Sequence, residues 1–154
     1  MCFFWGVFLV TLVDQASKLI IQKNMVLRES IPVINGIFHI TYIQNPNSAF
    51  GLFKFKNTIF ILIALLVILV IFYFFRRSIM NGNRTIFFAF IFILGGSIGN
   101  MIDRVRLGSV IDFIDFRIWP IFNIADTALN IGLFLLVIHF LFQQKDDAEN
   151  KQEY

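Results

Sequence analysis

The sequence is poor in charge and has almost no cysteine. Only 15% of its 154 residues are Asp, Glu, Lys or Arg, whereas about 25% is usual for a soluble domain. Together with a hydrophobic content of 58%, this deficit excludes a soluble globular enzyme and a disordered chain. The single cysteine, Cys2, has no partner in the chain, which excludes a disulfide-stapled secreted domain.

Long uncharged runs are what the sequence does contain. The segments 57–75, 85–102 and 127–144 each hold 18 or 19 residues without an acid or a base. At a rise of about 1.5 Å per residue, each run is long enough to cross the hydrocarbon core of a bilayer. The N-terminal stretch 1–13 resembles the apolar part of a signal peptide, but no base precedes it and no small-residue cleavage site follows. We therefore expect it to be retained as a first span.

These runs predict an all-α membrane protein with a single domain over residues 1–154, built as a four-transmembrane-helix bundle. The spans are expected at about 3–21, 57–75, 85–102 and 122–142. Between the first two spans, residues 26–56 contain turn residues and a strand-like alternation, which predicts a small β-element on the membrane surface. The polar residues 145–154 are expected to form a solvated, frayed tail.

The charges that are present indicate a lipid partner and leave the orientation open. The net charge is +3, and the thirteen bases are scattered beside apolar runs, so we expect contact with anionic headgroups and not with nucleic acid. Three arginines in the link 76–84 favour a cytoplasmic position for that link. The loops on the opposite side carry at least as many bases, so charge alone does not decide the orientation.

Two polar stripes at helical spacing are predicted on the third and fourth spans. They consist of Gly96, Asn100 and Asp103 on the third span and of Asn123, Asp126 and Asn130 on the fourth. Across an antiparallel hairpin the two stripes would face each other. An Asp at the centre of a membrane helix costs about 2.5–3.5 kcal/mol, so acids in such a place indicate a functional site.

Packing alone is an alternative explanation for part of this pattern. Gly95-x-x-x-Gly99 is also a spacing that allows close helix approach, and asparagines commonly link membrane helices by hydrogen bonds. Asp14 and Lys18 are likewise compatible with a plain i,i+4 ion pair near a helix end. Packing does not explain why Asp103, Asp112 and Asp126 gather at one membrane boundary.

Asp112 lies between apolar neighbours in the segment 110–116, so burial should raise its pKa. Asp103, next to Arg104 and near a loop end, is expected to be ionised and paired. Two carboxyl groups that share one proton allow one to activate water while the other protonates the leaving group. We favour Asp112 with Asp126 as this pair and keep Asp103 in reserve.

Five motifs in order resemble those of lipoprotein signal peptidase, also called signal peptidase II. They are Asp14-Gln15-x-x-Lys18, Asn45-x-Asn47-x-Ala49-Phe50-Gly51, Gly95-Gly96-x-x-Gly99-Asn100-x-x-Asp103-Arg104, Val110-x-Asp112-Phe113 and Phe122-Asn123-x-Ala125-Asp126. The resemblance covers most of the chain. One departure is Asn47, where the family usually has Gly, and it puts contacts in that stretch in doubt.

The resemblance implies an aspartic endopeptidase of the bacterial inner membrane. It would remove signal peptides from prolipoproteins by cutting before the diacylglyceryl-modified cysteine, with an aspartate pair and water and without a cofactor or metal. It also implies cytoplasmic termini, an active site near the outer face and an extracytoplasmic β-element, and we expect a monomer among membrane lipids. The matching catalytic residues are Asp112 and Asp126. Residues matched to substrate binding or support are Asp14, Lys18, Asn45, Asn100, Asp103, Arg104 and Asn123.

Other activities fit the residues less well. A zinc protease would need His-Glu-x-x-His, whereas His39 and His139 stand alone and are interpreted as an ordinary strand residue and a helix-end residue. Ser97 has no histidine in its motif region, and the Gly-x-Gly-Asp signature of presenilin-like proteases is missing. A small transporter or channel, or a structural membrane subunit, remains the rival hypothesis. A transporter usually has ionisable residues near mid-span, and a structural subunit would need none of these acids.

Overall fold

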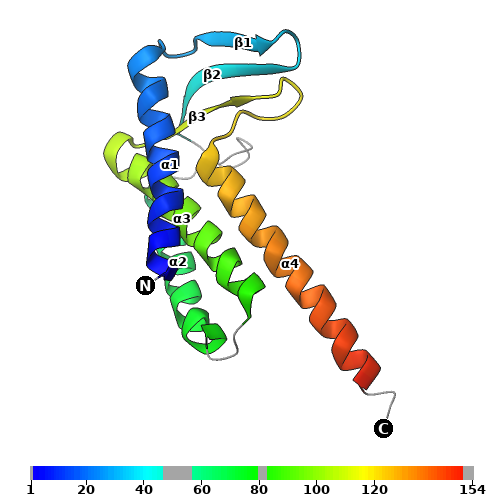
Figure 1. Ribbon diagram of the computed structural model, residues 1–154. Helices are drawn as coiled ribbons and strands as arrows, with labels where there is room; N and C mark the ends of the chain where they lie inside the picture. The colour runs from blue at the N-terminus through cyan, green and yellow to red at the C-terminus, as the bar shows by residue number, and fades with distance from the viewer. Residues whose placement is uncertain (1, 47–56, 80–82, 151–154) are drawn as a thin grey trace.

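The computed structural model describes residues 2–46, 57–79 and 83–150. In chain order its elements are α1 (Cys2–Asn24), β1 (Ser30–Ile34), β2 (Phe38–Asn45), α2 (Asn57–Ile79), α3 (Arg84–Leu107), β3 (Val110–Asp115) and α4 (Ile124–Asn150). The helices form a bundle, and the three strands form one sheet at one end of it (Figure 1). The beginning of α1 and the far end of α4 lie away from the sheet, at the opposite end of the bundle (Figure 1).

Helix α3 is the centre of the bundle, because it contacts α1, α2 and α4. Its glycines make the close contacts possible. A Cβ atom at Gly96 would overlap the carbonyl oxygen of Ala125 on α4, and one at Gly95 would lie 2.6 Å from Cβ of Val10 on α1. The close helix approach inferred from the small residues of this segment is therefore confirmed.

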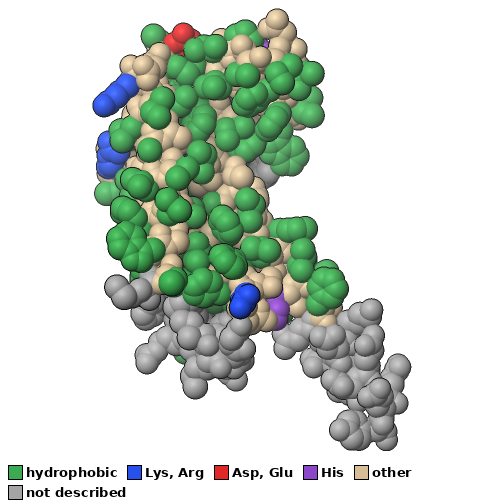
Figure 2. Space-filling view, viewed as in Figure 1, with side chains coloured by type: hydrophobic (Ala, Val, Ile, Leu, Met, Phe, Trp, Pro, Cys, Tyr) green, Lys and Arg blue, Asp and Glu red, His purple; other side chains and the backbone are tan. Residues whose placement is uncertain are grey.

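The outward surface of the helices is apolar, and in Figure 2 hydrophobic side chains cover most of the visible face. Within the described residues, Cys2–Asn24, Arg84–Leu107 and Ile124–Phe142 are long and apolar enough to cross a membrane. The chain is thus a multi-pass membrane protein. In α2 the apolar segment found among the described side chains is Ile61–Ile71, so the count of four spans stays a prediction.

The sheet is antiparallel, with strand order β1-β2-β3. The predicted β-element after the first helix is present as the hairpin of β1 and β2, and its remaining residues 47–56, with Asn47 among them, lie outside the described residues. Strand β3, which sequence reasoning missed, comes from the link between α3 and α4. It pairs Asp112 with Ile43 and Asp115 with His39. The third strand therefore carries Asp112 from the helical hairpin to the sheet.

All four helices continue beyond the predicted ends of their spans, and the extensions of α3 and α4 correct two predictions. Helix α3 continues to Leu107, so Asp103 lies inside a helix and not at a loop end. Helix α4 continues to Asn150, so the frayed tail predicted from residue 145 is wrong for 145–150, whereas 151–154 lie outside the described residues. Neither extension contains Gly or Pro, so nothing in it breaks the helix. Helix α3 ends at Gly108, whose φ of 71° is in the left-handed region that favours glycine.

Candidate active site

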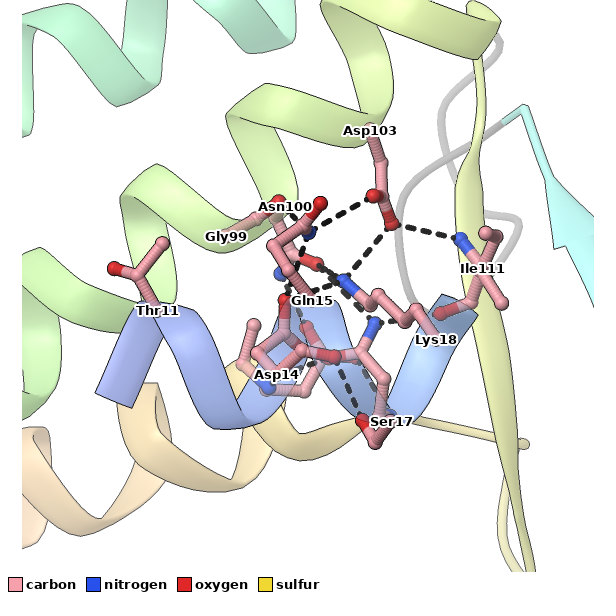
Figure 3. A network of polar contacts seen from close by, with 12 residues as sticks. Thr11, Asp14, Gln15, Ser17, Lys18, Gly99, Asn100, Asp103 and Ile111 are labelled. Carbon is pink, nitrogen blue, oxygen red and sulfur yellow. Dashed lines mark hydrogen bonds and ion pairs between the residues drawn. The ribbon is translucent and has the colours of Figure 1, made fainter. Parts of the chain in front are cut away.

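A buried ion pair on α1 is the base of the site. Asp14 and Lys18 are 0% and 1% exposed, and Lys18 Nζ lies 2.9 Å from Asp14 Oδ2, which confirms the predicted i,i+4 pair. The same Nζ lies 2.9 Å from Asp103 Oδ2 and 3.1 Å from Asn100 Oδ1, both on α3 (Figure 3). One ammonium group therefore connects two helices and serves two buried carboxylates.

Asp103 has a different environment from the expected one. It is 1% exposed, and its Oδ2 atom accepts a hydrogen bond of 3.1 Å from the backbone N–H of Ile111 in addition to its contact with Lys18. Arg104 is the neighbour that was expected to pair with Asp103. Its electrostatic interactions with Asp126 and Asp112 are stronger than its interaction with Asp103. Consecutive residues point in directions about 100° apart on a helix, so Asp103 faces α1 while Arg104 turns toward the end of α4.

Gln15 is a site residue that sequence reasoning did not select. Its Nε2 atom donates to Asp103 Oδ1 at 3.0 Å, to the Gly99 carbonyl oxygen at 3.0 Å and to Asp14 Oδ2 at 3.2 Å (Figure 3). It therefore ties α1 to α3 beside the ion pair. Its place in the motif Asp14-Gln15-x-x-Lys18, next to Asp14, could have indicated a site residue. The sequence alone does not show whether a glutamine on a membrane helix points into the bundle or toward lipid.

The N-terminus of α4 is capped reciprocally by Asn123 and Asp126. Asn123 Oδ1 accepts a hydrogen bond of 2.9 Å from the Asp126 backbone N–H, and Asp126 Oδ2 accepts one of 3.4 Å from the Asn123 backbone N–H. From α1, Asp14 Oδ1 accepts a third hydrogen bond, of 2.9 Å, from the backbone N–H of Ala125. The free N–H groups and the dipole at a helix N-terminus favour negative charge, and Asp126 lies in that first turn.

Asn123 also brings the two favoured aspartates together. Its Nδ2 atom donates to Asp112 Oδ1 at 2.7 Å, while its backbone and side chain contact Asp126 as described. From β2, Asn45 Nδ2 donates to Asp112 Oδ2 at 3.1 Å. The carboxyl groups from β3 and α4 thus share one asparagine.

Asn100 connects this pair to the buried lysine. Its Nδ2 atom donates to Asp126 Oδ1 at 2.8 Å, and its Oδ1 atom accepts from Lys18 at 3.1 Å and from Asn123 Nδ2 at 3.2 Å. The two stripes therefore face each other at Asn100, Asn123 and Asp126, as predicted. Asp103, the last member of the α3 stripe, contacts Lys18 on α1 instead. Asn130, the last member of the α4 stripe, is exposed.

Asp112 lies where its protonated form is favoured. It is 3% exposed between the buried side chains of Ile111 and Phe113. Burial, reinforced by the negative charge of Asp126, raises the pKa of Asp112 to about 7, although hydrogen bonds from Asn45 and Asn123 oppose the increase. The direction agrees with the prediction from sequence. A carboxyl group with such a pKa can hold or release a proton near neutral pH, as acid–base catalysis requires.

All nine residues selected from the sequence lie in this one network or directly beside it. Helix α1 contributes Asp14 and Lys18, and β2 contributes Asn45. The other residues come from α3, from β3 and from the start of α4, and are Asn100, Asp103, Arg104, Asp112, Asn123 and Asp126. Chemically, the arrangement offers two adjacent carboxyl groups, amide N–H donors around them and a nearby guanidinium group. This combination suits general acid–base activation of water.

Comparisons with known proteins agree with this geometry. The family model described as signal peptidase (SPase) II matches residues 6–142. The lipoprotein signal peptidase of Halothermothrix orenii is 43% identical over 139 residues, which cover 90% of this chain and 94% of that protein. That of Desulforapulum autotrophicum is 39% identical over 148 residues, which cover 90% of this chain and 91% of that protein.

Two solved structures, both of bacterial membrane enzymes crystallised by the in meso method, have the same fold. The one at 2.3 Å resolution is 34% identical, with a TM-score of 0.86 over 94% of this chain and 90% of that chain. The one at 1.9 Å resolution is 36% identical, with a TM-score of 0.81 over 91% of this chain and 92% of that chain.

Proposed function

Because the chain belongs to the signal peptidase II family, a family of proteases that process lipoproteins, we propose that it cleaves prolipoproteins with Asp112 and Asp126 as its catalytic pair. The bond cut is the one before the diacylglyceryl-modified cysteine. The observation that carries the assignment is the shared contact of both carboxyl groups with Asn123, from two different elements.

The reaction follows from one proton shared by two carboxyl groups. The ionised carboxylate takes a proton from water, and the water attacks the scissile carbonyl carbon. The protonated carboxyl group then donates its proton to the nitrogen of the departing cysteine residue, which breaks the peptide bond. The step needs neither a covalent intermediate nor a metal. Amide donors beside the pair, such as Asn45, stabilise the negative charge that develops on the carbonyl oxygen.

The other selected residues support this pair. Lys18, Asp14 and Asp103 are at most 1% exposed, so we assign them to bracing the site and not to contact with substrate. Arg104 is partly exposed and interacts with both aspartates, so it is placed to balance their charge. Asn100 and Asn123 hold the carboxyl groups in position.

The proposed placement in the cell is the bacterial inner membrane, with four spans, cytoplasmic termini and the site near the outer face. It is supported by the location of the sheet at one end of the bundle and of the beginning of α1 and the far end of α4 at the other (Figure 1). The substrate would enter from the bilayer, with its acyl chains remaining in lipid while the peptide reaches the pair. We expect the enzyme to act as a monomer.

A cleavage assay with a purified, diacylglyceryl-modified prolipoprotein tests the proposal. We expect Asp112→Asn and Asp126→Asn each to lower kcat by at least about 100-fold, because each removes one partner of acid–base catalysis. Asp115→Asn is the matched control, since Asp115 is a buried aspartate three residues further along β3 whose partners are Thr41 and Arg117. It should keep its activity.

Two results would contradict the assignment. Appreciable cleavage by Asp112→Asn would transfer its role to Asp103, so Asp103→Asn belongs in the same assay, with thermal unfolding recorded for every variant. No cleavage by the well-folded parent would reject the peptidase and return the transporter hypothesis to first place.

A further inference from the structure

Lys18 is too deeply buried to meet a substrate, yet it lies one side chain away from the proposed catalytic pair. Its side chain is 1% exposed, and its Nζ atom contacts Asp14, Asp103 and Asn100 (Figure 3). Two of these contacts neutralise charge. The third contact, to the amide oxygen of Asn100, neutralises no charge. The amide nitrogen of the same Asn100 donates a hydrogen bond to Asp126.

The donors around Asn100 determine which way its amide points. Its Oδ1 atom accepts from Lys18 Nζ and from Asn123 Nδ2, so its Nδ2 atom is directed at Asp126 Oδ1. With the amide reversed, three N–H donor groups would meet without an acceptor, and Asn100 Oδ1 would oppose a carboxylate oxygen. Both arrangements would be costly in a buried site.

An N–H group aimed at a carboxylate favours its charged form. Asp126 receives two, from the side chain of Asn100 and from the backbone of Asn123, and it lies in the first turn of α4, where the helix dipole adds to the effect. The charged groups that face Asp126 are Lys18 on α1, Arg104 on α3 and Asp112 on β3. The two cations favour a negative Asp126, whereas Asp112 opposes it unless Asp112 carries the proton.

We propose that Lys18 is a positioning residue that makes the pair asymmetric: by orienting the Asn100 amide, it keeps Asp126 ionised as the general base and leaves the shared proton on Asp112 as the general acid. The inference rests on the proposed function of the pair. It also assigns the two proton transfers: water gives its proton to Asp126, and the leaving nitrogen takes its proton from Asp112.

A matched pair of double variants separates orientation from charge. Replacing Lys18 alone would leave two buried carboxylates without a cation, so Asp14→Asn accompanies each change. In Asp14→Asn/Lys18→Met and Asp14→Asn/Lys18→Gln the three positions keep the parent's net charge of −1. Met and Gln have similar shapes, but only Gln can donate a hydrogen bond toward Asn100.

The pH dependence of kcat/KM, with kcat and KM measured separately, is the readout. We expect the acidic limb of the Met variant to move to higher pH by about one unit, because Asp126 loses an oriented donor. The limb of the Gln variant should stay near that of the parent, which has the same net charge at these three positions, and KM should be unchanged in both. The proposal would be overturned if the acidic limbs of the two double variants coincided, or if only KM changed. A purely structural role of Lys18 would lower thermal stability without separating the two acidic limbs.

The position of the proton is measured without activity and without changing Lys18. At pH 6 the infrared spectrum of the parent should contain the carbonyl band of a buried carboxylic acid. Asp112→Asn should lose this band and Asp126→Asn should keep it, and the opposite result would overturn the assignment. If the two single variants still cleave substrate, the proposed function itself fails. If they are inactive but the limbs coincide, only the role of Lys18 fails.

Discussion

Strand β3 holds two aspartates, Asp112 and Asp115, that are three residues apart and have opposite environments. Both are buried, at 3% and 4% exposed. Asp112 faces a second carboxylate and apolar neighbours, and its pKa is raised to about 7. Burial alone would also raise the pKa of Asp115, but hydrogen bonds from Thr41 and from the backbone and side chain of Arg117 lower it below the usual value. Burial by itself therefore does not decide how a carboxyl group behaves; its partners do.

The two ends of β3 lie in regions of opposite polarity. At the helix ends the interior is polar and charged, and each charge has partners within the protein. Toward Asp115 the sheet and the following loop, residues 116–121, expose apolar side chains, among them Ile34, Ile37 and Ile118 at 51%, 61% and 93% exposed. Charge inside and apolar groups outside is the reverse of a soluble protein and suits a chain surrounded by lipid.

The largest effect is expected from breaking the charged region. Lys18→Met leaves Asp14 and Asp103 buried without their cation, so the free energy of unfolding should fall by about 3–5 kcal/mol. Arg117→Met removes the half-exposed partner of Asp115 and should cost no more than about 1 kcal/mol. Thermal unfolding in the same detergent compares the two, and equal losses would contradict the distinction between the regions.

The pH dependence of stability should differ in sign for the two aspartates. The folded-state pKa of Asp112 is raised to about 7 from an ordinary 3.8, so its ionisation destabilises the fold progressively as pH rises from about 4 to 7. At about 1.4 kcal/mol per pKa unit, Asp112→Asn should gain up to a few kcal/mol relative to the parent between pH 4 and 8. The folded-state pKa of Asp115 is lowered, so its contribution is present above about pH 4 and is lost as pH falls through that pKa.

Unfolding midpoints at pH 4, 6 and 8 for the parent, Asp112→Asn and Asp115→Asn provide the measurement. Parallel curves for the two variants would show that the aspartates are equivalent. Activity supplies a second check, because cleavage by the parent should decline as pH rises beyond about 7, where Asp112 loses its proton, and Asp115→Asn should decline at the same pH.

A smaller effect is expected at the outer end of β3. Thr41 Oγ1 donates a buried hydrogen bond of 2.7 Å to Asp115 Oδ2, and Thr41→Val removes the donor without changing the shape of the side chain much. The free energy of unfolding should fall by about 1–3 kcal/mol, with cleavage intact. Loss of cleavage without loss of stability would extend the active site to this end of the strand.

The smallest effect on stability is expected in the exposed loop. Hydrogen bonds from Arg117 to Asp115 and ring contacts of Phe116 with Phe38 and Phe122 hold this loop in place. Ile118 and Trp119 point outward, at 93% and 59% exposed. Ile118→Ser should change stability by no more than about 0.5 kcal/mol.

The same loop reports which solvent surrounds it. The only other tryptophan is Trp5, so a Trp5→Phe variant leaves Trp119 as the single fluorophore. Tryptophan prefers the membrane–water interface, and brominated lipids should quench its emission. Quenching by aqueous iodide but not by brominated lipid would place the loop in water and would contradict a lipid environment for this end of the strand.

Contacts within one helix were accessible from the sequence. The pairing of Asp14 with Lys18 follows from their spacing, and the uncharged runs are found within α2, α3 and α4. Contacts between distant segments were not. Strand β3 pairs with β2 across about seventy residues, so no local pattern announces it. The predicted partner of Asp103, the adjacent Arg104, was wrong for a related reason, since Asp103 contacts α1 and the backbone of β3.

The amino-acid sequence by itself determined the solvent and the chemical groups available: its apolar runs require lipid, and its acids and amides supply the side chains of the proposed catalytic pair and its supports. Tertiary structure decided what each acid does. Asp14 caps α4, Asp103 binds Lys18, and Asp112 and Asp126 meet at Asn123. The reason is physical, because the ionisation of a carboxyl group depends on burial and on charges within a few ångströms, and those neighbours come from four separate segments of the chain.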